Sequence, residues 1–137
     1  MNTLSEIKLF LSLAERVSQE SYCVRKKVGA VLVTSHGVIS IGYNGTASGE
    51  SNVCELEDGT TNPEVLHAES NVFAKTLKAG LSTDGAKLYV TLQPCLDCAK
   101  LIYQSGIKEV YFSEKYRCTK GVAFLERLGI LVKQITK

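Results

Sequence analysis

The sequence lacks several features that would place a protein in a specialised class. It has no tryptophan, two prolines and one methionine among 137 residues, and its longest apolar run is Gly29 to Val33. A membrane-spanning helix needs about 20 apolar residues, so this run is far too short. Residues 1–20 alternate apolar and charged positions at helical spacing, unlike a signal peptide. We therefore expect no membrane or export segment and a cytoplasmic location.

The chain also lacks an excess of charge of one sign. Sixteen Lys and Arg residues face fourteen Asp and Glu residues, which leaves a formal net charge of +2. This is too little to predict a nucleic-acid partner. A hydrophobic content of 45% with 22% charged residues is ordinary for a globular protein. We expect one domain over residues 1–137, large enough to bury a core without disulfides.

Cysteines are present in an odd number, five, in a chain without an export signal. This number argues against a disulfide framework and favours reduced thiols, some of which could bind metal. Cys23 and Cys118 are expected to be small buried apolar residues. Cys54 falls in a polar loop and is expected to be a free thiol.

Hydrophobic periodicity predicts an α/β protein. We expect an irregular loop over 46–62, a β-hairpin from two consecutive strands, and the order α-β-β-α-β-α-β-α-β. This order indicates one mixed five-stranded sheet with helices on its faces, and the connection 113–129 is long enough for a parallel crossover. The expected helices are 5–19, 63–78, 94–104 and 122–128, and the expected strands are 28–33, 38–43, 87–92, 108–112 and 130–135.

Two short motifs carry the chemistry: His67-Ala68-Glu69, and Pro94-Cys95 followed by Cys98. Cysteines at i and i+3 in the first turn of a helix share one face, and the helix N-terminus favours thiolates. Zinc prefers imidazole and thiolate ligands, and three protein ligands leave the fourth position for water. We therefore predict that His67, Cys95 and Cys98 bind one catalytic zinc ion.

Glu69 lies two residues after the predicted histidine ligand, where its carboxylate can exchange a proton with water at the open metal position. We predict that Glu69 is the catalytic acid and base. The combination of His-x-Glu with Pro-Cys-x-x-Cys is typical of zinc-dependent nucleobase deaminases. A lone Cys-x-x-Cys would fit structural zinc or redox chemistry equally well.

Further segments point to one branch of these enzymes. They are Cys23-Val-Arg25, Val28 to Val31, Ile41 to Gly45, His67 to Asn71, Leu88 to Thr91, Cys98 to Leu101 and Gln104 to Val110. With them the sequence resembles the deoxycytidylate (dCMP) deaminases of the cytidine and deoxycytidylate deaminase superfamily, over nearly the whole chain. The resemblance implies a three-layer α-β-α cytidine-deaminase-like fold. It also implies zinc-dependent hydrolysis of dCMP to dUMP and ammonia, which supplies dUMP for thymidylate synthesis.

The resemblance also implies substrate contacts. Asn44 would bind the deoxyribose hydroxyl, and the backbone at Ala68 and Gln93 would contact the pyrimidine edge. Arg25 suits a phosphate because guanidinium matches its geometry, and Tyr116 is a second candidate. Two simpler interpretations stand beside these. Asn44 before a glycine could serve only a turn with positive φ, and Arg25 could belong to a solvated basic run.

The same resemblance implies a homo-oligomer, typically a hexamer, with dCTP as activator and dTTP as inhibitor. A triphosphate effector would bring Mg²⁺ with it. Some relatives carry a longer insertion before the His-Ala-Glu motif and a second, structural zinc. The insertion here is short and offers no ligand set around Cys54, so we expect one zinc only.

Three rival functions share part of this pattern. A dCTP deaminase, or one acting on both nucleotides, would use the same ring chemistry and a few more cations. A tRNA adenosine deaminase would need a more basic surface than a net charge of +2 provides. A structural zinc in a non-catalytic binding module would use a fourth Cys or His, which the motifs do not supply.

Overall fold

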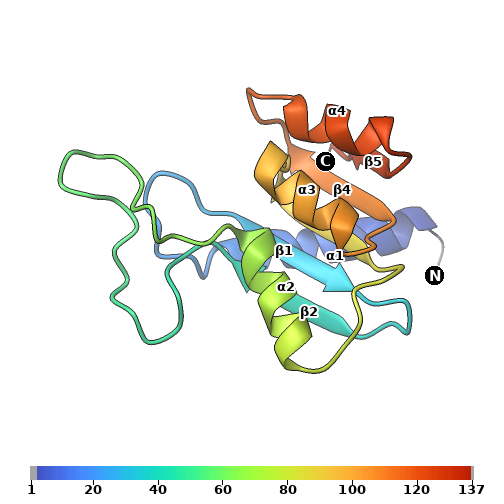
Figure 1. The fold of residues 1–137 in the computed structure, drawn as a ribbon, viewed down its shortest axis with the longest axis horizontal. Coiled ribbons are helices and arrows are strands. Elements are labelled where there is room, and N and C mark those ends of the chain that lie inside the picture. Colours follow the sequence, from blue (N-terminus) through green and yellow to red (C-terminus); the bar gives the residue numbers. More distant parts are fainter. Residues whose placement is uncertain (1–2, 137) are drawn as a thin grey trace.

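A computed structural model describes residues 3–136 of the chain. Its elements follow the predicted order, and Figure 1 shows a sheet with helices on both sides. The helices are α1 (Thr3–Ser18), α2 (Ala68–Lys78), α3 (Leu96–Gln104) and α4 (Lys120–Arg127). The strands are β1 (Gly29–Val33), β2 (Ile39–Tyr43), β3 (Lys87–Leu92), β4 (Glu109–Glu114) and β5 (Leu131–Gln134).

The five strands form one mixed sheet in the order β2-β1-β3-β4-β5. β1 pairs antiparallel with both β2 and β3, whereas β3, β4 and β5 run parallel to one another. The predicted β-hairpin and the predicted parallel crossover into the last strand are therefore both confirmed. Because parallel neighbours share a direction, β3 and β4 end at the same edge of the sheet.

Side-chain alternation along the strands builds a core on each face of the sheet. On one face α1 packs its apolar stripe against Val31, Val33, Tyr89 and Tyr111. On the other face α2, α3 and α4 pack against the alternate side chains, which include Leu32, Leu88, Val90 and Val110. In Figure 1 the first helix accordingly lies behind the sheet and the other three lie in front. This arrangement confirms the predicted three-layer α-β-α architecture.

The second and third helices begin later than predicted. α2 starts at Ala68 rather than near Pro63, because Leu66 forms an antiparallel bridge with Gly45 through two backbone hydrogen bonds. An extended residue in such a bridge cannot also take helical angles. α3 starts at Leu96 rather than Pro94, and Cys95 is its extended N-cap residue. Both predicted starts were therefore wrong by a few residues, in the same direction.

The cysteine prediction was wrong for one pair. Cys23 and Cys54 form a disulfide with a sequence separation of 31, and both residues are buried. The number of cysteines gave no sign of this, because folding brings the loop after β2 against the segment before β1. Cys118 is a free thiol but only half-buried, so its predicted burial was too high.

Within residues 3–136, no helix is both long enough and apolar enough to cross a bilayer.

Candidate active site and metal centre

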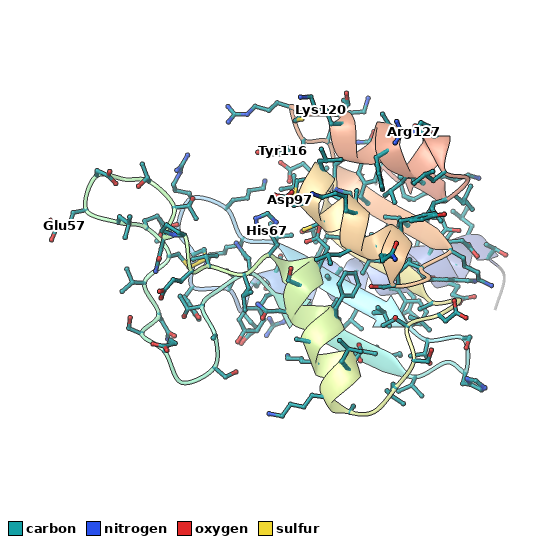
Figure 2. The ribbon with its side chains drawn as sticks, in the orientation of Figure 1. Glu57, His67, Asp97, Tyr116, Lys120 and Arg127 are labelled. Carbon is teal, nitrogen blue, oxygen red and sulfur yellow. A yellow bond between two sulfur atoms is a disulfide. The ribbon has the colours of Figure 1, made fainter. Side chains whose placement is uncertain are left out.

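Two helix N-termini meet at the edge of the sheet where β3 and β4 end. His67 is the N-cap residue of α2, with φ −69° and ψ 157°, and Cys95 is the N-cap of α3, with φ −75° and ψ 171°. Neither side chain caps its own helix, so both are available to other groups. Figure 2 shows His67 at the start of α2 facing the start of α3, where Asp97 is labelled.

The three predicted metal ligands lie together. One ligand atom from each of His67, Cys95 and Cys98 falls within 4.8 Å of the others. The Nδ1 atom of His67 lies 3.2 Å from the sulfur of Cys98 and 3.6 Å from that of Cys95. Ligand atoms around a tetrahedral zinc lie about 3.3–3.8 Å apart, given bonds of about 2.0–2.3 Å. The donor set and its spacing therefore fit one zinc ion.

The two thiols of the cluster shift each other's pKa in opposite directions. A hydrogen bond from Cys98, helped by His67, lowers the pKa of Cys95 to about 4. The same contact with Cys95, together with burial, raises the pKa of Cys98. The hydrogen bond with Cys95 also raises the pKa of His67. Because zinc binds thiolates and neutral imidazole, metal binding would release the protons that these groups hold among themselves.

Glu69 is buried beside the cluster, with 4% of its surface exposed. Burial raises the pKa of its carboxyl group, while its own backbone N–H and His67 act in the opposite direction. A buried carboxylate with a raised pKa can hold a proton and release it near neutral pH, which a general acid and base requires. Its position in the first turn of α2 keeps it close to the predicted ligand His67.

Two glycines allow neighbouring elements to pack closely against α2 and the start of α3. A Cβ atom on Gly121, in α4, would lie 2.4 Å from the carbonyl oxygen of Pro94 and 2.8 Å from that of Cys95. A Cβ atom on Gly42, in β2, would lie 2.7 Å from the backbone nitrogen of Val72 in α2. Both neighbours are backbone atoms that cannot rotate away. The two helix starts are therefore held by close contacts that only glycine permits.

A cavity of about 240 Å³ opens beside the cluster. One side, which we call the metal wall, is lined by His67, Ala68, Glu69, Leu92, Gln93 and Cys95, and we include in it the third cluster residue, Cys98. A second group of lining residues, which we call the loop wall, includes the Cys23–Cys54 disulfide and comprises Cys23, Arg25, Lys26, Val28, Asn44, Cys54, Glu55, Thr61 and Val65. In Figure 1 the loop after β2 projects away from the sheet and the layered helices. All five predicted substrate residues line the cavity: Arg25, Asn44, Ala68, Gln93 and Tyr116.

Asn44 joins two segments of the loop wall. Its Oδ1 accepts a hydrogen bond from the Val28 N–H at 2.9 Å, and its Nδ2 donates to the Lys26 carbonyl at 2.8 Å. Among residues 3–136 no residue other than glycine has a positive φ, so the turn interpretation of Asn44 is wrong. Its side chain organises the backbone around the cavity and remains at the cavity surface.

Gln93 and Tyr116 are joined by a hydrogen bond. The Gln93 side chain accepts a hydrogen bond from the Tyr116 N–H at 3.1 Å. The Gln93 backbone N–H donates to the Glu114 carbonyl at 2.8 Å, so of its two backbone groups the carbonyl is the one left for a ligand. Ala68 differs, because its N–H lies in the first turn of α2 and has no backbone acceptor within the described chain.

Comparison with known proteins agrees with this geometry. Residues 4–114 match the family model described as the cytidine and deoxycytidylate deaminase zinc-binding region. The chain belongs to this deaminase family. The chain is 34% identical to ComE operon protein 2 of Bacillus subtilis, over 98% of this chain and 74% of that protein. It is 35% identical to the deoxycytidylate deaminase of Enterobacteria phage T4, over 77% of this chain and 76% of that protein.

A solved structure also resembles this member of the family closely. It is the dCMP deaminase of the cyanophage S-TIM5 in complex with dCMP and dUMP, with a TM-score of 0.92 and 46% sequence identity. The match covers 98% of this chain and 99% of that chain. A zinc-binding family and a His-Cys-Cys cluster of suitable spacing together support a zinc ion in this deaminase.

Sequence reasoning missed several residues of the loop wall in this deaminase. Glu55 lines the cavity from a segment interpreted as an irregular loop, and Lys26 pairs with Glu114 at 2.6 Å. The disulfide also lines the cavity. No periodicity marks such positions, because each is defined by contacts between segments about thirty or more residues apart.

Proposed function

We propose that this protein hydrolyses dCMP to dUMP and ammonia. The observation that carries the proposal is a buried carboxylate, Glu69, beside a zinc-compatible cluster in a cavity that Arg25 and Asn44 also line. Water adds to C4 of the cytosine ring, the exocyclic amine leaves as ammonia, and C4 keeps the oxygen as a carbonyl. The product, dUMP, is the nucleotide from which thymidylate is made.

Zinc held by His67, Cys95 and Cys98 would lower the pKa of a bound water and make it nucleophilic at neutral pH. Glu69 then carries the protons. Its carboxylate accepts one from the attacking water and delivers it to N3 of the ring, and it then takes the proton of the new C4 hydroxyl and delivers it to the departing amine. Burial supports this role, because it raises the pKa of the carboxyl group and so helps the group to hold a proton between the two transfers.

The pyrimidine edge is held by backbone groups of the metal wall. The Ala68 N–H points from the start of α2 and donates to the O2 carbonyl of the ring. The Gln93 carbonyl accepts from the exocyclic amine, because its N–H is already engaged with Glu114. Backbone groups at the starts and ends of regular elements move little, so they would place C4 reproducibly beside Glu69 and the three cluster residues.

The sugar and phosphate lie toward the loop wall. Asn44 binds the deoxyribose hydroxyl, Arg25 binds the phosphate, and the Tyr116 hydroxyl is a second phosphate donor. Lys26 lines the same cavity, but its ammonium group is paired with Glu114. A carboxylate, Glu55, also lines this side. One guanidinium beside a carboxylate suits a single phosphate better than three, which favours dCMP over dCTP.

The decisive experiment measures ammonia release from the zinc-loaded protein with cytidine, dCMP, dCTP and tRNA as substrates. We expect turnover with dCMP to exceed that with every other substrate, and a chelator to abolish it. Deamination of tRNA alone, or of no free nucleotide, would contradict the proposal. Faster turnover of dCTP than of dCMP would support the proposed deamination chemistry but would make the triphosphate the preferred substrate.

We further propose that residues 1–137 act as one deaminase domain, in the cytoplasm, within a homo-oligomer such as a hexamer. Exposed Ile39 and Ile41 on the edge strand β2 support self-association, because unpaired apolar edges tend to be covered. We also propose dCTP and dTTP as effectors, with Mg²⁺ accompanying the triphosphate. Sedimentation analysis and the same assay with each nucleotide added, with and without Mg²⁺, test these points.

A further inference from the structure

Glu55 occupies an unexpected place for an acidic residue. It lies in the loop wall of a cavity that, in the proposed function, receives a phosphate. A free carboxylate there would repel the substrate. The hydrogen bonds of Glu55 show that its carboxylate is engaged by other groups of the protein.

The carboxylate of Glu55 accepts hydrogen bonds from two successive backbone amides. The Val24 N–H lies 3.3 Å from Oε1 and 3.2 Å from Oε2, and the Arg25 N–H lies 3.2 Å from Oε2. Hydrogen bonds to an ionised acceptor are stronger than those between neutral groups. Glu55 thus holds the backbone from which the Arg25 side chain extends.

Two other contacts join the same segments. The Cys23–Cys54 disulfide directly precedes Val24 on one segment and Glu55 on the other. The Arg25 guanidinium donates through Nη1 to the Gly59 carbonyl at 3.1 Å. A guanidinium carries five N–H groups, so this single bond leaves donors for a phosphate while limiting the rotation of the side chain.

We propose that Glu55 is a positioning residue for substrate binding, which fixes the Val24–Arg25 backbone and thereby directs the Arg25 guanidinium to the phosphate of the nucleotide. The inference rests on the proposed function, in which Arg25 binds that phosphate. Fixing Arg25 before the substrate arrives lowers the entropy lost on binding. Because the backbone amides engage the Glu55 carboxylate, its repulsion of the phosphate is also reduced.

The test is a double-mutant cycle with dCMP as substrate and the zinc-loaded full chain. Glu55→Ala is expected to raise KM about tenfold, the scale of a hydrogen bond to a charged group, with kcat almost unchanged. Glu55→Gln keeps one acceptor oxygen and is expected to restore part of the loss. In an Arg25→Ala background, Glu55→Ala should raise KM no further, because the residue through which it acts is gone.

Glu57→Ala is the matched control. Figure 2 shows the Glu57 side chain at the outer tip of the same loop, pointing away from the cavity, so the same change of charge should leave KM unaltered. Equal effects of Glu55→Ala in both backgrounds, or a fall in kcat as large as the rise in KM, would overturn the proposal. An unchanged KM in Arg25→Ala would overturn it too, while leaving the deaminase function intact. Absence of dCMP turnover in the unaltered protein would instead refute the proposed function.

Discussion

The two walls of the cavity are built in different ways. The metal wall lies at the starts of α2 and α3 and at the end of β3, and it rests on the apolar core between the helices and the sheet. The loop wall contains no residue of a helix or strand, and it is held by a disulfide and by side chains that bind backbone groups. The groups proposed to perform the chemistry and to hold the pyrimidine ring thus sit on the rigid scaffold, and the groups proposed to hold the sugar and phosphate sit on the loop.

This difference has a physical basis. Displacing a reacting group by about 1 Å can cost about a hundredfold in rate, so catalytic groups benefit from support by a packed core. A phosphate tolerates more positional variation, because the attraction between charges falls slowly with distance. Changes in the metal wall should therefore lower kcat, whereas changes in the loop wall should raise KM.

Removal of a metal ligand should have the largest effect. Cys98→Ala deletes the buried sulfur of the cluster, and we expect loss of stoichiometric zinc and of detectable deamination. Metal content by atomic emission and ammonia release measure the two outcomes. Cys118→Ala, a free cysteine outside the cluster, is the control and should keep both. Full activity in Cys98→Ala would show that the metal wall is not needed for catalysis.

Loss of the proton carrier should come next. Glu69→Gln keeps the size of the side chain, so we expect zinc to be retained while kcat falls by about 10²–10⁴. Glu64→Gln makes the same chemical change at an exposed residue shortly before α2 and should have little effect. Loss of zinc from Glu69→Gln would make Glu69 a ligand instead of an acid and base.

A third change tests whether catalysis depends on the close packing of α4 against the start of α3. Gly121→Ala should force the backbone of Pro94 and Cys95 to move, because its Cβ atom would lie 2.4 Å from a carbonyl oxygen. Such overpacking costs about 1–3 kcal/mol. We expect a lower midpoint of thermal unfolding and a reduced kcat with KM little changed. Ala123→Ser, at an exposed site on the same helix, should alter neither quantity.

The disulfide should have the smallest effect on catalysis. With Cys23→Ser and Cys54→Ser combined, the contacts of Glu55 and Arg25 remain, so we expect KM to rise less than in Glu55→Ala. Stability should fall by about 2–4 kcal/mol, the usual contribution of a disulfide. Kinetics with dCMP and chemical denaturation measure these outcomes. A fall in kcat with unchanged KM would contradict the separation between the two walls.

The elements of the fold were largely predictable because their signals are local. Alternation of apolar residues marks the strands, and the long connection from β4 to β5 allowed their parallel pairing. The starts of α2 and α3 were not predictable from local preference. Pro63 and Pro94 both suit the first turn of a helix, but the bridge between Gly45 and Leu66 keeps the chain extended until His67.

The sequence by itself determined the metal wall. Its ligands and its carboxylate lie in two short motifs whose spacing follows from helix geometry, so no tertiary information was needed to bring Cys95 and Cys98 together. Only the tertiary structure decided the loop wall. The Cys23–Cys54 bond, the contact of Glu55 with Val24 and Arg25, and the bonds of Asn44 all join segments distant along the chain. Such contacts depend on how the whole chain folds, and no local pattern encodes them.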